Sequence, residues 1–132
     1  IILALTSNKG AEDFQFHGKG NQARLFESVL QASSKWGNQD NTMYVIGATQ
    51  ASMLIKVREI VPDHFLLIPG VGAQGGDLTE VAQYGMNNRC GLIVNSSRAI
   101  IYADSTKHFA EVAREKALEV QGQMRKLLER IF

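Results

Sequence analysis

Residues 64–77 read HFLLIPGVGAQGGD, an apolar run that passes directly into a loop in which four of nine residues are glycine. A short apolar run bounded by turn residues predicts a buried strand. The glycines predict a loop whose backbone adopts positive φ or lies close to a ligand. In α/β proteins, ligands bind at loops that leave the carboxyl ends of parallel strands. The stretch therefore predicts a parallel sheet with a ligand site at its carboxyl edge.

Four apolar runs of this kind alternate with longer segments that have helical spacing. The predicted strands are residues 1–5, 43–48, 64–68 and 90–94. The predicted helices are residues 21–36, 49–60, 78–85, 97–103 and 107–130, with charged residues on the wet face of the last. Thr49 and Asp77 are the expected N-caps of two of them. The strands are continuous apolar runs, which is typical of parallel strands covered on both faces.

Four βα units fit either a small open sheet or half of an eight-stranded βα (TIM) barrel of about 250 residues. The chain has 132 residues and begins directly on a strand. We therefore expect an α/β fold that is roughly the second half of such a barrel. An isolated half leaves two bare strand edges. We expect another chain, or residues outside this sequence, to supply the missing half.

The composition is that of an ordinary globular domain and excludes several classes of protein. The net charge is +1, from 14 basic and 13 acidic residues, so it gives no reason to expect nucleic acid as a partner. No apolar run is long enough to span a bilayer, so we expect no membrane partner. A single cysteine, Cys90, fits a reducing compartment, and we expect a cytoplasmic protein in which this thiol is buried.

The glycine loop and an arginine one strand further on point to phosphate. Backbone N–H groups that precede a helix bind anions. Arg98 follows the next predicted strand, and an arginine there can hold phosphate through two parallel hydrogen bonds. Two alternatives remain open at this point: the loop is a tightly packed turn, or Arg98 forms a surface salt bridge.

Two segments together resemble a known family. LIPGVGAQGGD (67–77) followed by GLIVNSSRAIIYA (91–103) is similar to the C-terminal half of orotidine 5′-phosphate decarboxylase. LALTSNKGAEDFQ (3–15) and YVIGATQ (44–50) are also similar to its strand ends, and NSSR and SNKGAEDFQ indicate its type 2 branch. The resemblance implies a TIM barrel that acts as a homodimer without a cofactor. It implies conversion of orotidine monophosphate (OMP) to uridine monophosphate (UMP) and CO₂ in pyrimidine biosynthesis.

The resemblance assigns a phosphate site. Gln74 and Arg98 match the residues that hold the substrate phosphate in the family. The backbone of Gly72, Ala73 and Ser97 is expected beside the same phosphate. Many members of the family have glycine at the position of Ser97, so the expected contact there is a backbone N–H.

The resemblance also assigns a pyrimidine site. Ser7 matches the serine that hydrogen-bonds the pyrimidine edge, and Pro69 and Val71 are expected to line the base pocket. Asn8 and Lys9 replace residues that are often His and Pro in relatives, so the resemblance assigns them no role.

The family's catalytic Asp and Lys residues, in the pattern D-x-K-x-x-D, do not occur in these 132 residues. We therefore expect residues 1–132 to be the C-terminal half of one barrel domain, with no catalytic or metal-binding residues of their own and no activity alone. Two alternatives remain: another phosphate-binding βα barrel that acts on a sugar phosphate, and a non-catalytic half-barrel.

Overall fold

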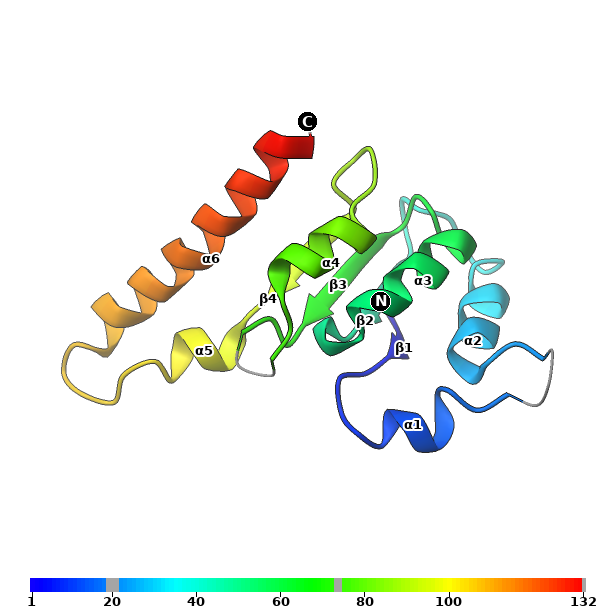
Figure 1. The fold of residues 1–132 in the computed structure, drawn as a ribbon, viewed down its shortest axis with the longest axis horizontal. Coiled ribbons are helices and arrows are strands. Elements are labelled where there is room, and N and C mark those ends of the chain that lie inside the picture. Colours follow the sequence, from blue (N-terminus) through cyan, green and yellow to red (C-terminus); the bar gives the residue numbers. More distant parts are fainter. Residues whose placement is uncertain (19–21, 73–74, 132) are drawn as a thin grey trace.

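The computed structural model describes residues 1–18, 22–72 and 75–131. Its centre is a parallel sheet with strands in the order β1-β2-β3-β4 (Figure 1). The strands are β1 (Ile2–Leu5), β2 (Met43–Ile46), β3 (Phe65–Pro69) and β4 (Leu92–Asn95). Each strand pairs with the next one along the chain, and all pairs are parallel. This is an α/β half-barrel, which confirms the fold expected from the sequence.

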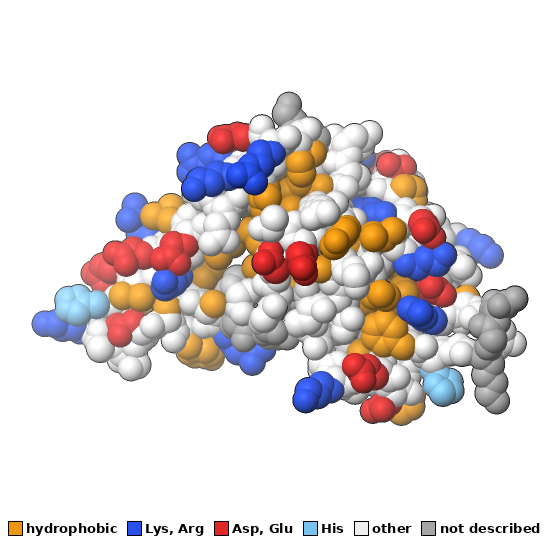
Figure 2. Space-filling view, viewed as in Figure 1, with side chains coloured by type: hydrophobic (Ala, Val, Ile, Leu, Met, Phe, Trp, Pro, Cys, Tyr) orange, Lys and Arg blue, Asp and Glu red, His pale blue; other side chains and the backbone are white. Residues whose placement is uncertain are grey.

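Helices follow every strand. They are α1 (Ala11–Phe14), α2 (Leu25–Ser33), the 3₁₀ helix η1 (Ala48–Met53), α3 (Leu54–Ile60), α4 (Leu78–Gly85), α5 (Ser97–Ile101) and α6 (Phe109–Ile131). Figure 1 shows α3 and α4 lying against the sheet and α6 running beside it as a long arm. Charged side chains of both signs gather over α6 (Figure 2). No residue of α6 is fully buried, as expected for a helix with a wide polar face.

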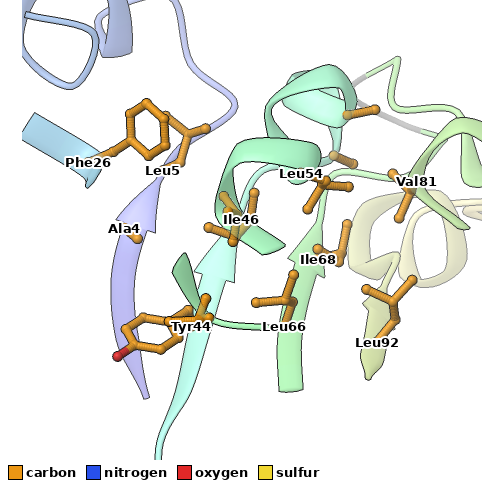
Figure 3. Close-up of a cluster of buried hydrophobic side chains, with 14 of the residues drawn as sticks. Ala4, Leu5, Phe26, Tyr44, Ile46, Leu54, Leu66, Ile68, Val81 and Leu92 are labelled. Atoms are coloured by element: carbon orange, nitrogen blue, oxygen red, sulfur yellow. The ribbon is translucent and has the colours of Figure 1, made fainter. Parts of the chain in front are cut away.

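The core lies between one face of the sheet and the helices. Tyr44 and Ile46 of β2 and Leu66 and Ile68 of β3 point to this face and are fully buried (Figure 3). They pack in one cluster with Leu54 of α3 and other helix residues. Burying a side chain of this size stabilises a fold by about 1.5–3 kcal/mol. The alternation of buried and less buried residues along β2 and β3 follows from the two-residue period of a strand.

The expectation that the strands are covered on both faces is wrong for this chain. The strand register aligns Leu3, Val45, Leu67 and Ile93 in one row on the face away from the core. Leu3 is 58% exposed and Ile93 is 46% exposed. The runs are apolar on both faces, but in the described part of the chain helices cover only one of them.

Two local predictions are also wrong, and one is confirmed. Thr49 does not cap its helix, because Gly47 is the N-cap and the Thr49 hydroxyl donates to the Ser7 carbonyl (3.3 Å). Cys90 is only half-buried and precedes β4 instead of opening it. Its φ of 67° and that of Gly91 (65°) place both residues in a left-handed turn that cannot continue a strand. Asp77 is an N-cap, since its carboxylate accepts from the amide of Thr79 (2.6 Å).

Arg58, which the sequence did not single out, joins several segments at the amino ends of β3 and β4. Its guanidinium donates to the carbonyls of Gly85 (2.7 Å), His64 (2.7 Å) and Gly91 (2.9 Å). Further acceptors are the carbonyls of Val61 and Pro62. Burial lowers the pKa of Arg58 to about 10. Arg58 therefore stabilises the fold at the amino edge of the sheet, opposite to the carboxyl edge that carries the candidate site.

Candidate functional site

A pocket of about 200 Å³ lies at the carboxyl edge of the sheet, between the ends of β3 and β4. It is lined by Pro69, Gly70 and Val71 on one side and by residues 95–98 on the other. The two sides meet because Pro69 pairs with Asn95 in the parallel register. The structure thus brings together four residues predicted from the sequence: Pro69, Val71, Ser97 and Arg98.

Arg98 supplies the positive charge of this pocket. Its side chain is exposed and lies in the first turn of α5. Within residues 1–18, 22–72 and 75–131 it forms no ion pair, so the surface salt bridge considered as an alternative is not found there. The neighbouring Ser97 hydroxyl donates to Asn95 Oδ1 (3.0 Å). A cation next to hydroxyl and amide groups suits an anion that has several oxygen atoms.

The glycine loop owes its shape to two different properties of glycine. Gly70, Gly72 and Gly75 have φ of 96°, 77° and 84°, which residues with a side chain rarely adopt. Gly76 instead packs closely, because a Cβ there would overlap the Cβ of Ala48. The loop is therefore a tight turn, as one of the alternatives proposed, and it also forms one wall of the pocket.

Some amides of the glycine loop donate hydrogen bonds to carbonyls of the same loop. The amide of Gly72 donates to the Gly76 carbonyl (3.1 Å), and the amide of Gly75 donates to the Gly72 carbonyl (2.8 Å). Gly72 faces a neighbouring pocket against α6 and does not line the one that holds Arg98. In this structure the amide of Gly72 is therefore already bonded within the loop. Ala73 and Gln74, both predicted to contact phosphate, lie outside the described residues.

Ser96 also belongs to this site, although the sequence did not single it out. Its side chain is buried, and its hydroxyl donates to the carbonyl of Val71 (3.0 Å). It therefore links the segment that carries Arg98 to the glycine loop. The only sequence signal was its position next to Ser97 and Arg98, and nothing in that pattern indicates which serine turns inward.

Ser7 lies at the same edge of the sheet but not in the pocket of Arg98. It follows β1, which is three strands from β4, so at about 4.8 Å per strand roughly 14 Å separate the two strand ends. The Ser7 hydroxyl is buried and has no hydrogen-bond partner among the described residues. It lies against Gly47, where a Cβ would overlap it. Ser7 thus lies at the opposite end of the edge, with its hydroxyl enclosed by the surrounding chain.

Asn8 and Lys9 are exposed and form the turn that leads into α1. The carbonyl of Asn8 accepts from the amide of Ala11 (3.0 Å), and that of Lys9 accepts from the amide of Glu12 (3.1 Å). The backbone carbonyls of these two residues therefore stabilise the start of α1.

The described residues show neither a metal site nor a membrane-spanning helix. No group of three or more His, Cys, Asp or Glu side chains there is arranged to hold a metal ion. None of the helices described is both long enough and apolar enough to cross a membrane.

Two curated proteins that are similar to this chain share one name. No family model matches the chain. It is 61% identical over 128 residues to orotidine 5′-phosphate decarboxylase of Phocaeicola vulgatus, covering 97% of this chain and 47% of that protein. It is 63% identical over 124 residues to the enzyme of the same name from Parabacteroides distasonis, covering 94% and 44%.

A solved structure supports the same relationship. The structure of UMP synthase from Leishmania donovani superposes with a TM-score of 0.69 at 35% identity, covering 87% of this chain and 26% of that one. The chain spans about half the length of the curated relatives it matches. Along nearly all of its length the chain is thus about 60% identical to roughly half of proteins named orotidine 5′-phosphate decarboxylase.

Proposed function

We propose that the protein containing this chain is an orotidine 5′-phosphate decarboxylase, and that this chain supplies the loops that bind the phosphate and the pyrimidine of its substrate. The observation that carries the proposal is the pocket between β3 and β4, where Arg98 stands without a carboxylate partner among the described residues. The identity to enzymes of that name, at about 60%, supports the choice of substrate.

The substrate would lie along the carboxyl edge of the sheet. Its phosphate is placed at Arg98, Ser97 and Gln74, with Gly72 and Ala73 beside it, and its pyrimidine near Pro69, Val71 and Ser7. The strand order supports this direction, because β1 and β4 are the two outer strands of the edge. Three strand spacings amount to roughly 14 Å along the sheet, and because a half-barrel is curved, the direct span for a nucleotide is shorter. The Ser7 hydroxyl is buried and unpartnered among the described residues, so a contact with the pyrimidine would require the turn after β1 to expose it.

The reaction needs groups that this chain does not carry. Breaking the bond between C6 of the pyrimidine and the carboxylate leaves the electron pair on C6, and a proton must then reach that carbon. The chain has no D-x-K-x-x-D pattern to stabilise the charge or donate the proton. We place those Asp and Lys residues in the missing half-barrel, which would also cover the apolar row of Leu3, Val45, Leu67 and Ile93. The complete protein is proposed to be a cytoplasmic homodimer that needs no cofactor, and this chain to be inactive alone.

The role of this half is to convert phosphate binding into catalysis. The phosphate does not react, but its binding energy can hold the pyrimidine against the charged groups of the other half. Gln74 would add a neutral hydrogen-bonding side chain to the same phosphate contact. Substrate lacking the phosphate should therefore lose turnover as well as affinity.

The proposal is tested by Arg98→Ala in the full-length protein. A charge-assisted contact to phosphate is worth about 2–4 kcal/mol, so KM for OMP should rise by about 30- to 1,000-fold, with a smaller fall in kcat. The matched control is Arg89→Ala, which removes an exposed arginine near the amino end of β4 and should leave KM unchanged. An unchanged KM in Arg98→Ala would reject the phosphate site.

Ligand competition separates this function from that of a sugar-phosphate barrel. An enzyme for OMP should bind UMP much more tightly than ribose 5-phosphate, because the pyrimidine has its own contacts. Equal affinity for the two ligands would favour the alternative in which the base is not recognised.

A further inference from the structure

Ser96 connects the two segments that form the pocket. Its side chain is 8% exposed, and its hydroxyl reaches the Val71 carbonyl across 25 positions of sequence. Among the described residues, this is the one side-chain hydrogen bond between the glycine loop and residues 95–98. It lies just beyond the last paired residues of β3 and β4, Pro69 and Asn95.

The hydroxyl of Ser96 does not cap the helix that follows it. Ser96 is the N-cap residue of α5, where a serine usually accepts a hydrogen bond from an amide of the first turn. In this structure its side chain makes no such cap. Helix α5 thus gives up a local stabilising contact, and the same hydroxyl holds the neighbouring loop instead.

The contact acts on the loop at its base. Three amides of the loop bond within it: Gly72 to the Gly76 carbonyl, Gly75 to the Gly72 carbonyl, and Gly76 to the Gly70 carbonyl. These bonds shape the loop but do not orient it toward Arg98. The Val71 carbonyl belongs to the same planar peptide unit as the Gly72 amide, so a donor on that carbonyl fixes the plane from which the loop departs.

We propose that Ser96 is a positioning residue that holds the glycine loop in register with Arg98, so that both segments contact one phosphate together. This inference rests on the proposed function, and it adds a residue that touches the loop and not the substrate. It predicts that losing the hydroxyl weakens binding of the phosphate group specifically.

The experiment measures dissociation constants of UMP and uridine for the full-length protein. In Ser96→Ala we expect the affinity for UMP to fall by about tenfold, as for loss of one hydrogen bond to a buried carbonyl, while the affinity for uridine stays the same. The ratio of the two constants is the readout, because a general loss of stability would not change it. Ser96→Cys, which keeps a similar volume with a weaker donor, should also reduce the preference for UMP over uridine, and it serves if Ser96→Ala does not fold.

Ser33→Ala is the matched control. Ser33 is a fully buried serine of α2 whose hydroxyl donates to the Val29 carbonyl (2.6 Å), far from the pocket in the sequence and on another element. Its loss should lower the melting temperature but leave the ratio of UMP to uridine affinity unchanged. In addition, Ser96→Ala should have little further effect on UMP in an Arg98→Ala background, because the two residues act on the same group.

The outcomes separate the inference from the proposed function. A wild-type protein that binds UMP no better than uridine contradicts the proposed function itself. A wild-type protein that prefers UMP, with the same preference in folded Ser96→Ala or Ser96→Cys, overturns the role of Ser96 and leaves the proposed function standing.

Discussion

Two arginines at opposite edges of the sheet are used in opposite ways. At the amino edge, Arg58 is half-buried and donates to five backbone carbonyls. At the carboxyl edge, Arg98 is exposed and has no ion-pair partner among the described residues. The comparison teaches that the charge of an arginine does not indicate its role, whereas the acceptors around it do. The Arg58 guanidinium bonds to backbone carbonyls of the fold, whereas the Arg98 guanidinium remains available for a ligand.

The largest effect on stability is expected from Arg58→Ala. The substitution leaves several carbonyls without a donor at the starts of β3 and β4. We expect the full-length protein to lose about 3 kcal/mol or more of its free energy of unfolding, measured by chemical denaturation. Arg58→Lys should also destabilise it, because an ammonium group lacks the planar fork that reaches these acceptors.

The distinction between the two arginines is wrong if Arg58→Ala and Arg98→Ala change stability and KM in the same way. We expect the KM of Arg58→Ala to stay near that of the wild type at temperatures where it is folded, and the stability of Arg98→Ala to stay near that of the wild type. A large rise in KM for Arg58→Ala, at full folding, would show that the two edges are not separate.

A smaller effect is expected from Gly76→Ala, which tests the packing of the glycine loop. The added Cβ would overlap the Cβ of Ala48 and lie 3.0 Å from the Gly70 carbonyl oxygen. Crowding of this kind costs about 1–3 kcal/mol, and we expect weaker binding of UMP as well. Isothermal titration and thermal melting measure the two changes.

The control for this variant is Gly122→Ala, on α6. An alanine Cβ there meets no described atom within 4 Å. Helix propensity should make it more stable by about 0.5–1 kcal/mol, with unchanged affinity for UMP. Equal effects of Gly76→Ala and Gly122→Ala would contradict a special role for the loop glycine.

The smallest effect is expected from the pH dependence of stability at the amino edge. His64 is buried, and neither ring nitrogen has a hydrogen-bond partner among the described residues. Burial first, and then the charge of Arg58, lowers the pKa of His64, while Asp63 acts in the opposite direction. An unfolded histidine has a pKa of about 6.5 and so takes up a proton more readily than the folded one. The contribution of His64 to stability is therefore complete above pH 6.5 and decreases as the pH falls below it.

The measurement is the free energy of unfolding between pH 7.5 and 5.5, in wild type and in His64→Gln. We expect the decrease toward low pH to be smaller in the variant. His108→Gln, at an exposed position near the start of α6, is the matched substitution and should keep the wild-type slope. A slope in His64→Gln identical to that of the wild type would show that the buried imidazole does not contribute.

The sequence predicted the elements well because their signals are local. The apolar runs located all four strands, and residues 78–85 were predicted as a helix with the bounds that α4 has. The error at Cys90 arose because a left-handed pair, Cys90 and Gly91, interrupts a run that reads as continuous strand. The error about the second sheet face arose because apolar residues indicate that a face is covered, but not that this chain covers it.

The candidate site was predicted only in part, for a physical reason. Pro69, Val71, Ser97 and Arg98 meet because neighbouring parallel strands end together, which a sequence pattern can indicate. Ser96 and Arg58 were missed because their roles depend on hydrogen bonds to carbonyls far away in the sequence, at Val71 and Gly91 among others. A backbone carbonyl has no residue type, so no motif can mark it as a partner.

The most direct test of the central claim is a crystal structure of the full-length protein with UMP bound. The account predicts the phosphate in the pocket between β3 and β4, with its oxygen atoms about 2.7–3.2 Å from the Arg98 guanidinium. Ser96 should still donate to the Val71 carbonyl in that complex. A phosphate bound elsewhere, with the Arg98 side chain in solvent, would contradict the account.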